Sequence, residues 1–118
     1  MKDTAVKRDW LFLPVHKIDD LVLRKATKRA YWKGGKVNLT VRQFDLVDLL
    51  FSHRGTDISS RKLYDTFRGR PGLLAGNGPE GYRVNLRVVI MHIRKTFKAI
   101  DPAFDEIETF AGFGYRWK

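Results

Sequence analysis

The feature that most constrains this chain is segment 82–99, which carries five Lys or Arg and no Asp or Glu. On a helix, where successive residues turn by about 100°, four of its apolar side chains fall within one narrow sector. These are Leu86, Ile90, Ile93 and Phe97. They predict a helix from Arg83 to about Ala99 that turns this sector toward a hydrophobic core.

The opposite sector of the same helix holds a second apolar row. It contains Val84, Val88 and Met91, with Lys95 beside them and further cations on the flanks. An ordinary exposed helix mixes charge signs and gains i,i+4 ion pairs, whereas this one has no acid to pair. Cations that face phosphates and apolar groups that face base edges in a major groove explain the pattern. Packing of the row on another protein element is the alternative.

The first third of the chain reads as short strands separated by polar turns. Residues 21–24, 29–32 and 36–39 are rich in strand-favouring side chains, and segment 10–15 could form a further strand. Gly34-Gly35 is a suitable two-residue hairpin turn, since glycine accepts positive φ. We therefore expect a small antiparallel sheet here.

Two helices are predicted between this sheet and the basic segment. Thr40-Val-Arg-Gln43 matches a capping box, and Phe44, Val47, Leu50 and Phe51 follow as a helical stripe. A second short helix is expected after Ser59-Ser60, with Leu63, Tyr64 and Phe67 turned inward. Segment 69–81 holds five glycines and two prolines and is predicted to be a loop. It lacks the Gly-Lys-Ser/Thr ending of a phosphate-binding loop.

The C-terminus reads as a β-hairpin. Residues 106–110 and 115–118 are the predicted strands, and Gly112 and Gly114 allow the reversal between them. Alternation places Tyr115 and Trp117 on one side and Arg116 and Lys118 on the other. The aromatic pair is expected to anchor the hairpin to the core.

The composition narrows the class of partner. The 118 residues carry a formal net charge of +10, which favours a polyanion. There is no cysteine, so disulfides and thiolate metal sites are excluded, in agreement with a reducing cytoplasm. No apolar run reaches the length of a membrane span, and we expect no membrane partner.

Four spaced motifs together resemble the winged-helix DNA-binding domain of OmpR/PhoB-type response regulators. Leu39-Thr40 with Gln43-Phe44 and Leu46-Val47 looks like the start of that family's first helix. Ser60-Arg61-x-Leu63 is similar to the start of its second helix, and Ile90-x-x-Ile93-Arg94-Lys95 to its recognition helix. The most specific motif is Ile107-x-Thr109-x-x-Gly112-x-Gly114-Tyr115-Arg116, which resembles the family's wing.

The resemblance implies an α+β fold, a winged helix-turn-helix with an N-terminal antiparallel sheet, three helices and a C-terminal β-hairpin wing. It covers residues 18–118 as one domain, after a segment, 1–17, that we expect to be flexible or the remnant of an interdomain linker. It implies a transcriptional regulator of a two-component system that binds double-stranded DNA sequence-specifically in the bacterial cytoplasm, nucleoid-associated when bound. It further implies a monomer or weak homodimer that pairs in tandem on DNA, and contact of the 69–81 loop with RNA polymerase.

The resemblance also assigns roles to single residues. The residues that would face the major groove are Arg87, Val88, Met91 and His92. Asn85 would touch the DNA backbone, and other cations would lie near phosphates. The family commonly has an arginine at the position of Ala111, so Phe113 is the candidate to replace it near the minor groove. The full set of predicted DNA-binding residues is Asn85, Arg87, Val88, Met91, His92, Arg94, Lys95, Lys98, Phe113 and Arg116.

Catalytic and metal chemistry finds little support in the residues. His16, His53 and His92 lack the spacing of metal ligands, and no cofactor is expected. No serine lies in a nucleophile elbow or beside an evident base, so we expect a protein that is not an enzyme.

Two alternatives to DNA binding remain from the residues alone. The first is an RNA- or ribosome-associated basic domain, which would display aromatic platforms. Tyr31 and Trp32 are adjacent on a strand and therefore face opposite sides, which argues against one platform. The second is a protein-interaction module, with the 69–81 loop and the Val84, Val88 and Met91 row as its contact surface.

Overall fold

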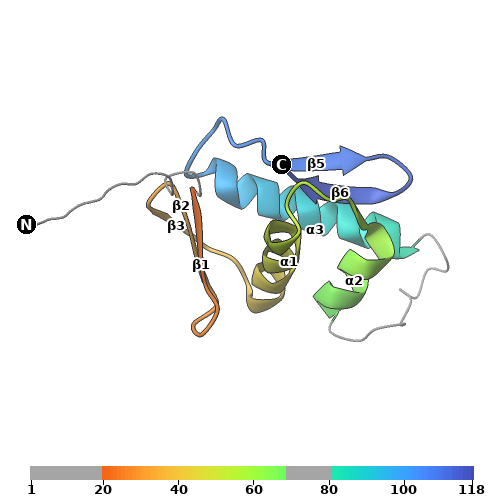
Figure 1. The fold of residues 1–118 in the computed structure, drawn as a ribbon, viewed down its shortest axis with the longest axis horizontal. Coiled ribbons are helices and arrows are strands. Elements are labelled where there is room, and N and C mark those ends of the chain that lie inside the picture. The colour runs from red at the N-terminus through yellow and green to blue at the C-terminus, as the bar shows by residue number, and fades with distance from the viewer. Residues whose placement is uncertain (1–19, 69–80) are drawn as a thin grey trace, which may run out of the picture.

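The computed structural model describes residues 20–68 and 81–118 (Figure 1). The elements are β1 (Leu21–Arg24), β2 (Arg29–Trp32), β3 (Gly35–Val37), α1 (Val41–Ser52), β4 (Ile58–Ser59), α2 (Ser60–Arg68), α3 (Gly81–Lys98), β5 (Ile107–Phe110) and β6 (Gly114–Trp117). The predicted α+β class is confirmed. The expectations for 1–17, for the strand at 10–15 and for loop residues 69–80 lie outside the described residues.

The N-terminal sheet has the strand order β1-β2-β3, with antiparallel pairing throughout. One face of the sheet carries Leu21, Ala30, Trp32 and Val37, all buried. Figure 1 shows the sheet at one end of the molecule, with α1 and the end of α3 on its inner side. The predicted strand 36–39 differs from β3 at both ends. β3 begins one residue earlier, at Gly35, and ends two residues earlier, at Val37.

The predicted turn between β2 and β3 was wrong by one residue. Trp32 pairs with Gly35, so the two-residue loop is Lys33-Gly34, with φ of 50° and 86°. A type I′ turn needs positive φ at both positions, and lysine adopts it here. Gly35 instead belongs to β3, where an added Cβ would lie 2.8 Å from Cγ2 of Ile100. Its glycine allows the segment after α3 to pack closely on the sheet.

The start of α1 follows the predicted capping box. The Thr40 hydroxyl accepts from the Gln43 backbone N–H at 3.1 Å, and the Gln43 side chain accepts from the Thr40 N–H at 3.0 Å. The next helix begins with a similar device, because the Ser59 hydroxyl accepts from the Lys62 N–H at 3.1 Å. Both serve backbone N–H groups that a helix start leaves without partners.

The three helices and both sheets enclose one hydrophobic core. The predicted inner sector of α3, Leu86, Ile90, Ile93 and Phe97, is fully buried, as are Phe44, Val47 and Leu50 of α1. Phe51, predicted in the same stripe, is only half-buried, and Leu46 is buried instead. An aromatic cluster of Trp32, Phe97, Phe104 and Trp117 joins the N-terminal sheet to α3 and the C-terminal hairpin.

The C-terminal hairpin is confirmed, with β5 and β6 in antiparallel register. Tyr115 and Trp117 are buried as expected. The sequence did not reveal β4, which contributes only two residues and pairs with β6 to give the order β4-β6-β5. A Cβ on Gly114 would lie 1.9 Å from the Ile58 carbonyl oxygen, so glycine is needed where these strands meet.

Candidate nucleic-acid interface

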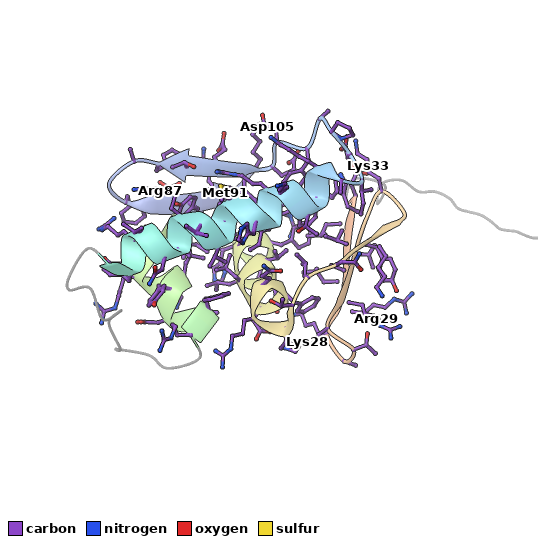
Figure 2. The ribbon with its side chains drawn as sticks, turned by 180° about the vertical axis from the view of Figure 1, so that it is seen from behind. Lys28, Arg29, Lys33, Arg87, Met91 and Asp105 are labelled. Carbon is purple, nitrogen blue, oxygen red and sulfur yellow. The ribbon has the colours of Figure 1, made fainter. Side chains whose placement is uncertain are left out.

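Helix α3 is held rigidly on one side and open on the other. Its buried sector fixes its rotation about its own axis, so the opposite sector is directed away from the core. Figure 2 labels Arg87 and Met91 on this helix, clear of α1 and α2. At about 1.5 Å per residue, α3 is long enough to lie across a DNA groove.

The predicted outer row of α3 is exposed. Val84, Val88 and Met91 have 51%, 43% and 54% of their surface accessible. No element within residues 20–68 and 81–118 covers this row, so the alternative of packing on another protein element would require a partner molecule. Three large apolar side chains on a basic helix form a surface suited to contact with another molecule.

The polar candidates of α3 surround this row. Asn85, Arg87, His92 and Lys95 are all exposed. Neither Arg87 nor Lys95 forms a salt bridge with an acid in residues 20–68 or 81–118. Their charges are thus available to an external anion.

Arg94, which the resemblance placed near phosphates, contacts the C-terminal hairpin in the structure. Its guanidinium donates to the Ile107 backbone carbonyl at 2.7 Å and to the Thr109 hydroxyl at 2.8 Å. It also lies 5.9 Å from the centre of the Tyr115 ring. This side chain links α3 to the C-terminal hairpin and fixes the distance between them.

A groove of about 560 Å³ runs between the first half of α3 and the hairpin. Arg83 and Arg87 line it on the helix side, and Thr109 to Gly112 line it on the hairpin side. The two arginines are four residues apart and so share a helix face. Arg83 was not among the predicted site residues, although its spacing to Arg87 was a signal that could have identified it.

The hairpin's own cations are paired with acids. The Arg116 guanidinium lies 2.9 Å from Oε1 of Glu108 and 3.5 Å from Oδ1 of Asp57. It also covers the Phe110 ring at 4.7 Å. The charge of Arg116 is therefore offset by two carboxylates, unlike that of Arg87 on α3.

Lys118 and Lys98 lie around Asp105. The Lys118 ammonium donates to Asp105 at 2.9 Å, which lowers the pKa of the Asp105 carboxyl and raises that of Lys118. Lys98 and Arg94 lower the Asp105 pKa further through their charge. The predicted candidate Lys98 thus has an acid in its neighbourhood.

Phe113 is exposed at the tip of the hairpin, with 48% of its surface accessible. Its backbone carbonyl accepts from the Ser60 N–H at 2.8 Å, which ties the tip to the first residue of α2. The aromatic ring is thus presented on a fixed turn beside the groove.

Across 20–68 and 81–118, no group of three or more His, Asp or Glu could hold a metal ion. None of the helices in these residues combines the length and the hydrophobicity that a membrane span requires.

The fold is similar to those of solved DNA-binding domains. That of CpxR from E. coli is 23% identical, with a TM-score of 0.65 over 84% of this chain and 90% of that one. That of Bacillus subtilis CssR is 24% identical, with a TM-score of 0.62 over 83% and 99%. That of Klebsiella pneumoniae RstA, solved in complex with the RstA box, is 20% identical, with a TM-score of 0.64 over 83% and 90%.

A family model gives the assignment. The model described as "Transcriptional regulatory protein, C terminal" matches residues 34–117, most of the chain. The match includes all three helices and the hairpin. The chain therefore belongs to the family of C-terminal domains of transcriptional regulatory proteins, which confirms its resemblance to OmpR/PhoB-type response-regulator domains.

Proposed function

We propose that this domain regulates transcription by binding double-stranded DNA sequence-specifically, with α3 in the major groove and the hairpin beside the minor groove. The observation that carries the proposal is the outer sector of α3. It combines the exposed row of Val84, Val88 and Met91 with two cations, Arg87 and Lys95, that pair with no acid in residues 20–68 and 81–118, on a helix whose rotation the core fixes. The solved RstA domain, of the same fold, binds its DNA box.

Roles follow from side-chain chemistry. Arg87 can donate two hydrogen bonds to a guanine edge, and Val88 and Met91 can contact thymine methyl groups. His92 follows Met91 and lies on the flank of this sector, and Asn85 can donate to a phosphate of the DNA backbone. The Lys95 ammonium group attracts phosphates through its charge. If about six phosphates are neutralised, log K falls with log salt at a slope near −5.

The hairpin contributes geometry more than charge. Arg94 and the Ser60–Phe113 hydrogen bond hold it against α3 and α2. The family commonly has an arginine at the position of Ala111. We assign Phe113 to replace it, through contact of its ring with the sugars of the DNA. Arg116, which two carboxylates surround, is the weakest of the predicted contacts.

Selection of bound duplexes from a random pool, read by sequencing, tests the proposal. A defined motif of a few base pairs is expected. Arg87→Ala is then expected to relax the preference at one base pair by about 1–3 kcal/mol. Lys95→Ala is the matched control on the same helix, and it should weaken selected and random duplexes alike.

Two results would contradict the proposal. One is a pool that yields no enriched motif although the protein is folded. The other is an equal loss for Arg87→Ala on selected and random duplexes, which would remove its role in reading bases. Stronger binding of hairpin RNA than of duplex DNA at matched salt would favour the RNA alternative.

The remaining assignments belong to the same proposal. A DNA-binding regulator needs no catalytic reaction, and we assign none. Its place would be the bacterial cytoplasm, at the nucleoid when bound. Residues 18–118 would act as the DNA-binding unit, as a monomer or weak homodimer that pairs in tandem on DNA. RNA polymerase is the partner that we assign to segment 69–81.

A further inference from the structure

The N-terminal sheet forms a second concentration of positive charge, separate from α3. Residues 21–37 contain six Lys or Arg and no Asp or Glu. Three of the six are matched by acids of neighbouring elements. Lys25 pairs with Asp48 at 3.6 Å, Lys28 with Asp45 at 2.6 Å and Lys33 with Asp101 at 3.2 Å.

The other three cations share one face of the sheet. The register pairs Arg24 with Arg29, and Tyr31 with both Val22 and Lys36, so these five side chains lie on the face opposite the buried one. Arg24, Arg29 and Lys36 are exposed and form no salt bridge within the described residues. Figure 2 labels Arg29 at the far end of the molecule from Arg87.

The face is also shaped for a polar partner. The Arg24 guanidinium lies 5.7 Å from the centre of the Tyr31 ring, which holds it above the sheet. A hollow of about 340 Å³ lies at the β3 edge, where Arg29 and Lys36 line it together with Thr27, Lys28 and residues 37–40. The nearest acid in sequence, Asp20, precedes β1 at the end of the strand away from Arg24.

We propose that this outer face, named here the sheet face and made of Arg24, Arg29 and Lys36 around Tyr31, binds the phosphate backbone of a DNA duplex without sequence preference. Among the described residues, its one large exposed apolar side chain is Val22, at 49% accessible. Its apolar part is limited to Val22 and the partly buried Tyr31, which is small for a protein interface, whereas protein–DNA interfaces are polar and strongly positive. The face therefore fits DNA better than an acidic protein.

The consequence is a domain with two DNA-contacting surfaces at different ends. A molecule bound to its site through α3 could hold a second duplex segment on the sheet face. This bridging rests on the proposed function of α3, whereas phosphate binding by the sheet face does not.

The test compares two triple variants of the full chain that have equal net charge. The sheet-face variant is Arg24→Gln, Arg29→Gln, Lys36→Gln. The matched control is Lys25→Gln, Lys28→Gln, Lys33→Gln, which removes three cations from the turns between the same strands, all of them paired with acids. Both are made in an Arg87→Gln, Lys95→Gln background, in which α3 is weakened, and in the wild-type background.

Binding of a random-sequence 30-base-pair duplex is measured across a salt series. In the α3-weakened background, the sheet-face variant should flatten the slope of log K against log salt by about 2.7, since each phosphate contact contributes about 0.9. The control should change it by less than 1. In the wild-type background, capture of a second labelled duplex on an immobilised one should fall at least tenfold for the sheet-face variant alone.

Equal losses in both triple variants would overturn the proposal, because net charge alone would then explain binding. If the sheet-face variant kept its binding of the duplex but lost binding of a polyglutamate peptide, the face would bind an acidic protein. This result would also overturn the proposal. Thermal unfolding of each variant confirms the fold, and Arg24→Lys with Arg29→Lys should keep the slope. A selection that finds no motif while the slope change persists would refute the role of α3 and leave the sheet face standing.

Discussion

Helix α3 and the C-terminal hairpin both carry cations, and the sequence predicted DNA contacts on both. On α3, Arg87 and Lys95 have no acidic partner among the described residues. On the hairpin, Arg116 lies between Glu108 and Asp57, and Lys118 holds Asp105. The difference teaches that a count of charges does not tell which charges are available to a partner.

The two elements also differ in how they are held. Burial of one sector is enough to fix α3, whereas the hairpin adds backbone pairing with β4 and the Arg94 hydrogen bonds to the burial of Tyr115 and Trp117. The hairpin thus serves as a frame for the helix, and the following predictions test that division of roles.

The largest effect is expected from Gly114→Ala. Its Cβ would lie 1.9 Å from the Ile58 carbonyl oxygen, so the β4–β6 pairing must separate. We expect a loss of more than about 3 kcal/mol in the free energy of unfolding, measured by urea denaturation. Gly112→Ala is the control, since its site is open and only its φ of 80° is unfavourable, at about 1 kcal/mol. Equal losses would show that the close approach of β4 is not what stabilises the hairpin.

The next largest effect separates the charges of the two elements. Arg87→Gln with Lys95→Gln should weaken duplex binding at physiological salt about 30-fold, from two lost phosphate or base contacts. Arg116→Gln with Lys118→Gln removes the same charge and should weaken it less than about threefold, since acids already offset both. Fluorescence anisotropy with one duplex measures both. Similar losses would break the distinction between helix and hairpin.

Arg94→Ala tests the link between the two elements. Loss of its hydrogen bonds to Ile107 and Thr109 should cost about 1.5 kcal/mol of stability. The salt slope of DNA binding should stay within about 0.3 of the wild type, because the guanidinium faces the hairpin. Lys95→Ala should show the reverse pattern. If Arg94→Ala flattened the salt slope of DNA binding and left the stability unchanged, Arg94 would contact phosphates rather than link the two elements.

The smallest effect concerns Asp101, in the segment between α3 and β5. The Trp32 indole N–H donates to its carboxylate at 2.9 Å, and this together with Lys33 lowers its pKa below the ordinary 3.8. The stabilisation is therefore full above pH about 4 and disappears as the pH falls through the lowered pKa. The difference in unfolding free energy between wild type and Asp101→Asn, measured from pH 7 to 2.5, should shrink accordingly. A difference that does not change with pH would contradict this.

Local patterns predicted most of the fold. The Thr40–Gln43 capping box, the inner sector of α3 and the alternation at Tyr115 and Trp117 depend only on residues close in sequence, and all three are confirmed. The errors arose where distant segments meet. Gly35 makes room for Ile100 rather than forming the turn, and β4 exists because it pairs with β6. The predicted DNA contacts themselves stay predictions.

The sequence by itself determined that α3 would be a helix with a buried sector and a basic outer one, because helical periodicity is a property of neighbouring residues. Only the tertiary structure decided which cations remain available. Arg94 and Arg116 met partners from other elements, while Arg24, Arg29 and Lys36 were gathered on one face by strand register. The physical reason is that charge pairing depends on distances in space, and these are set by how the core brings the elements together.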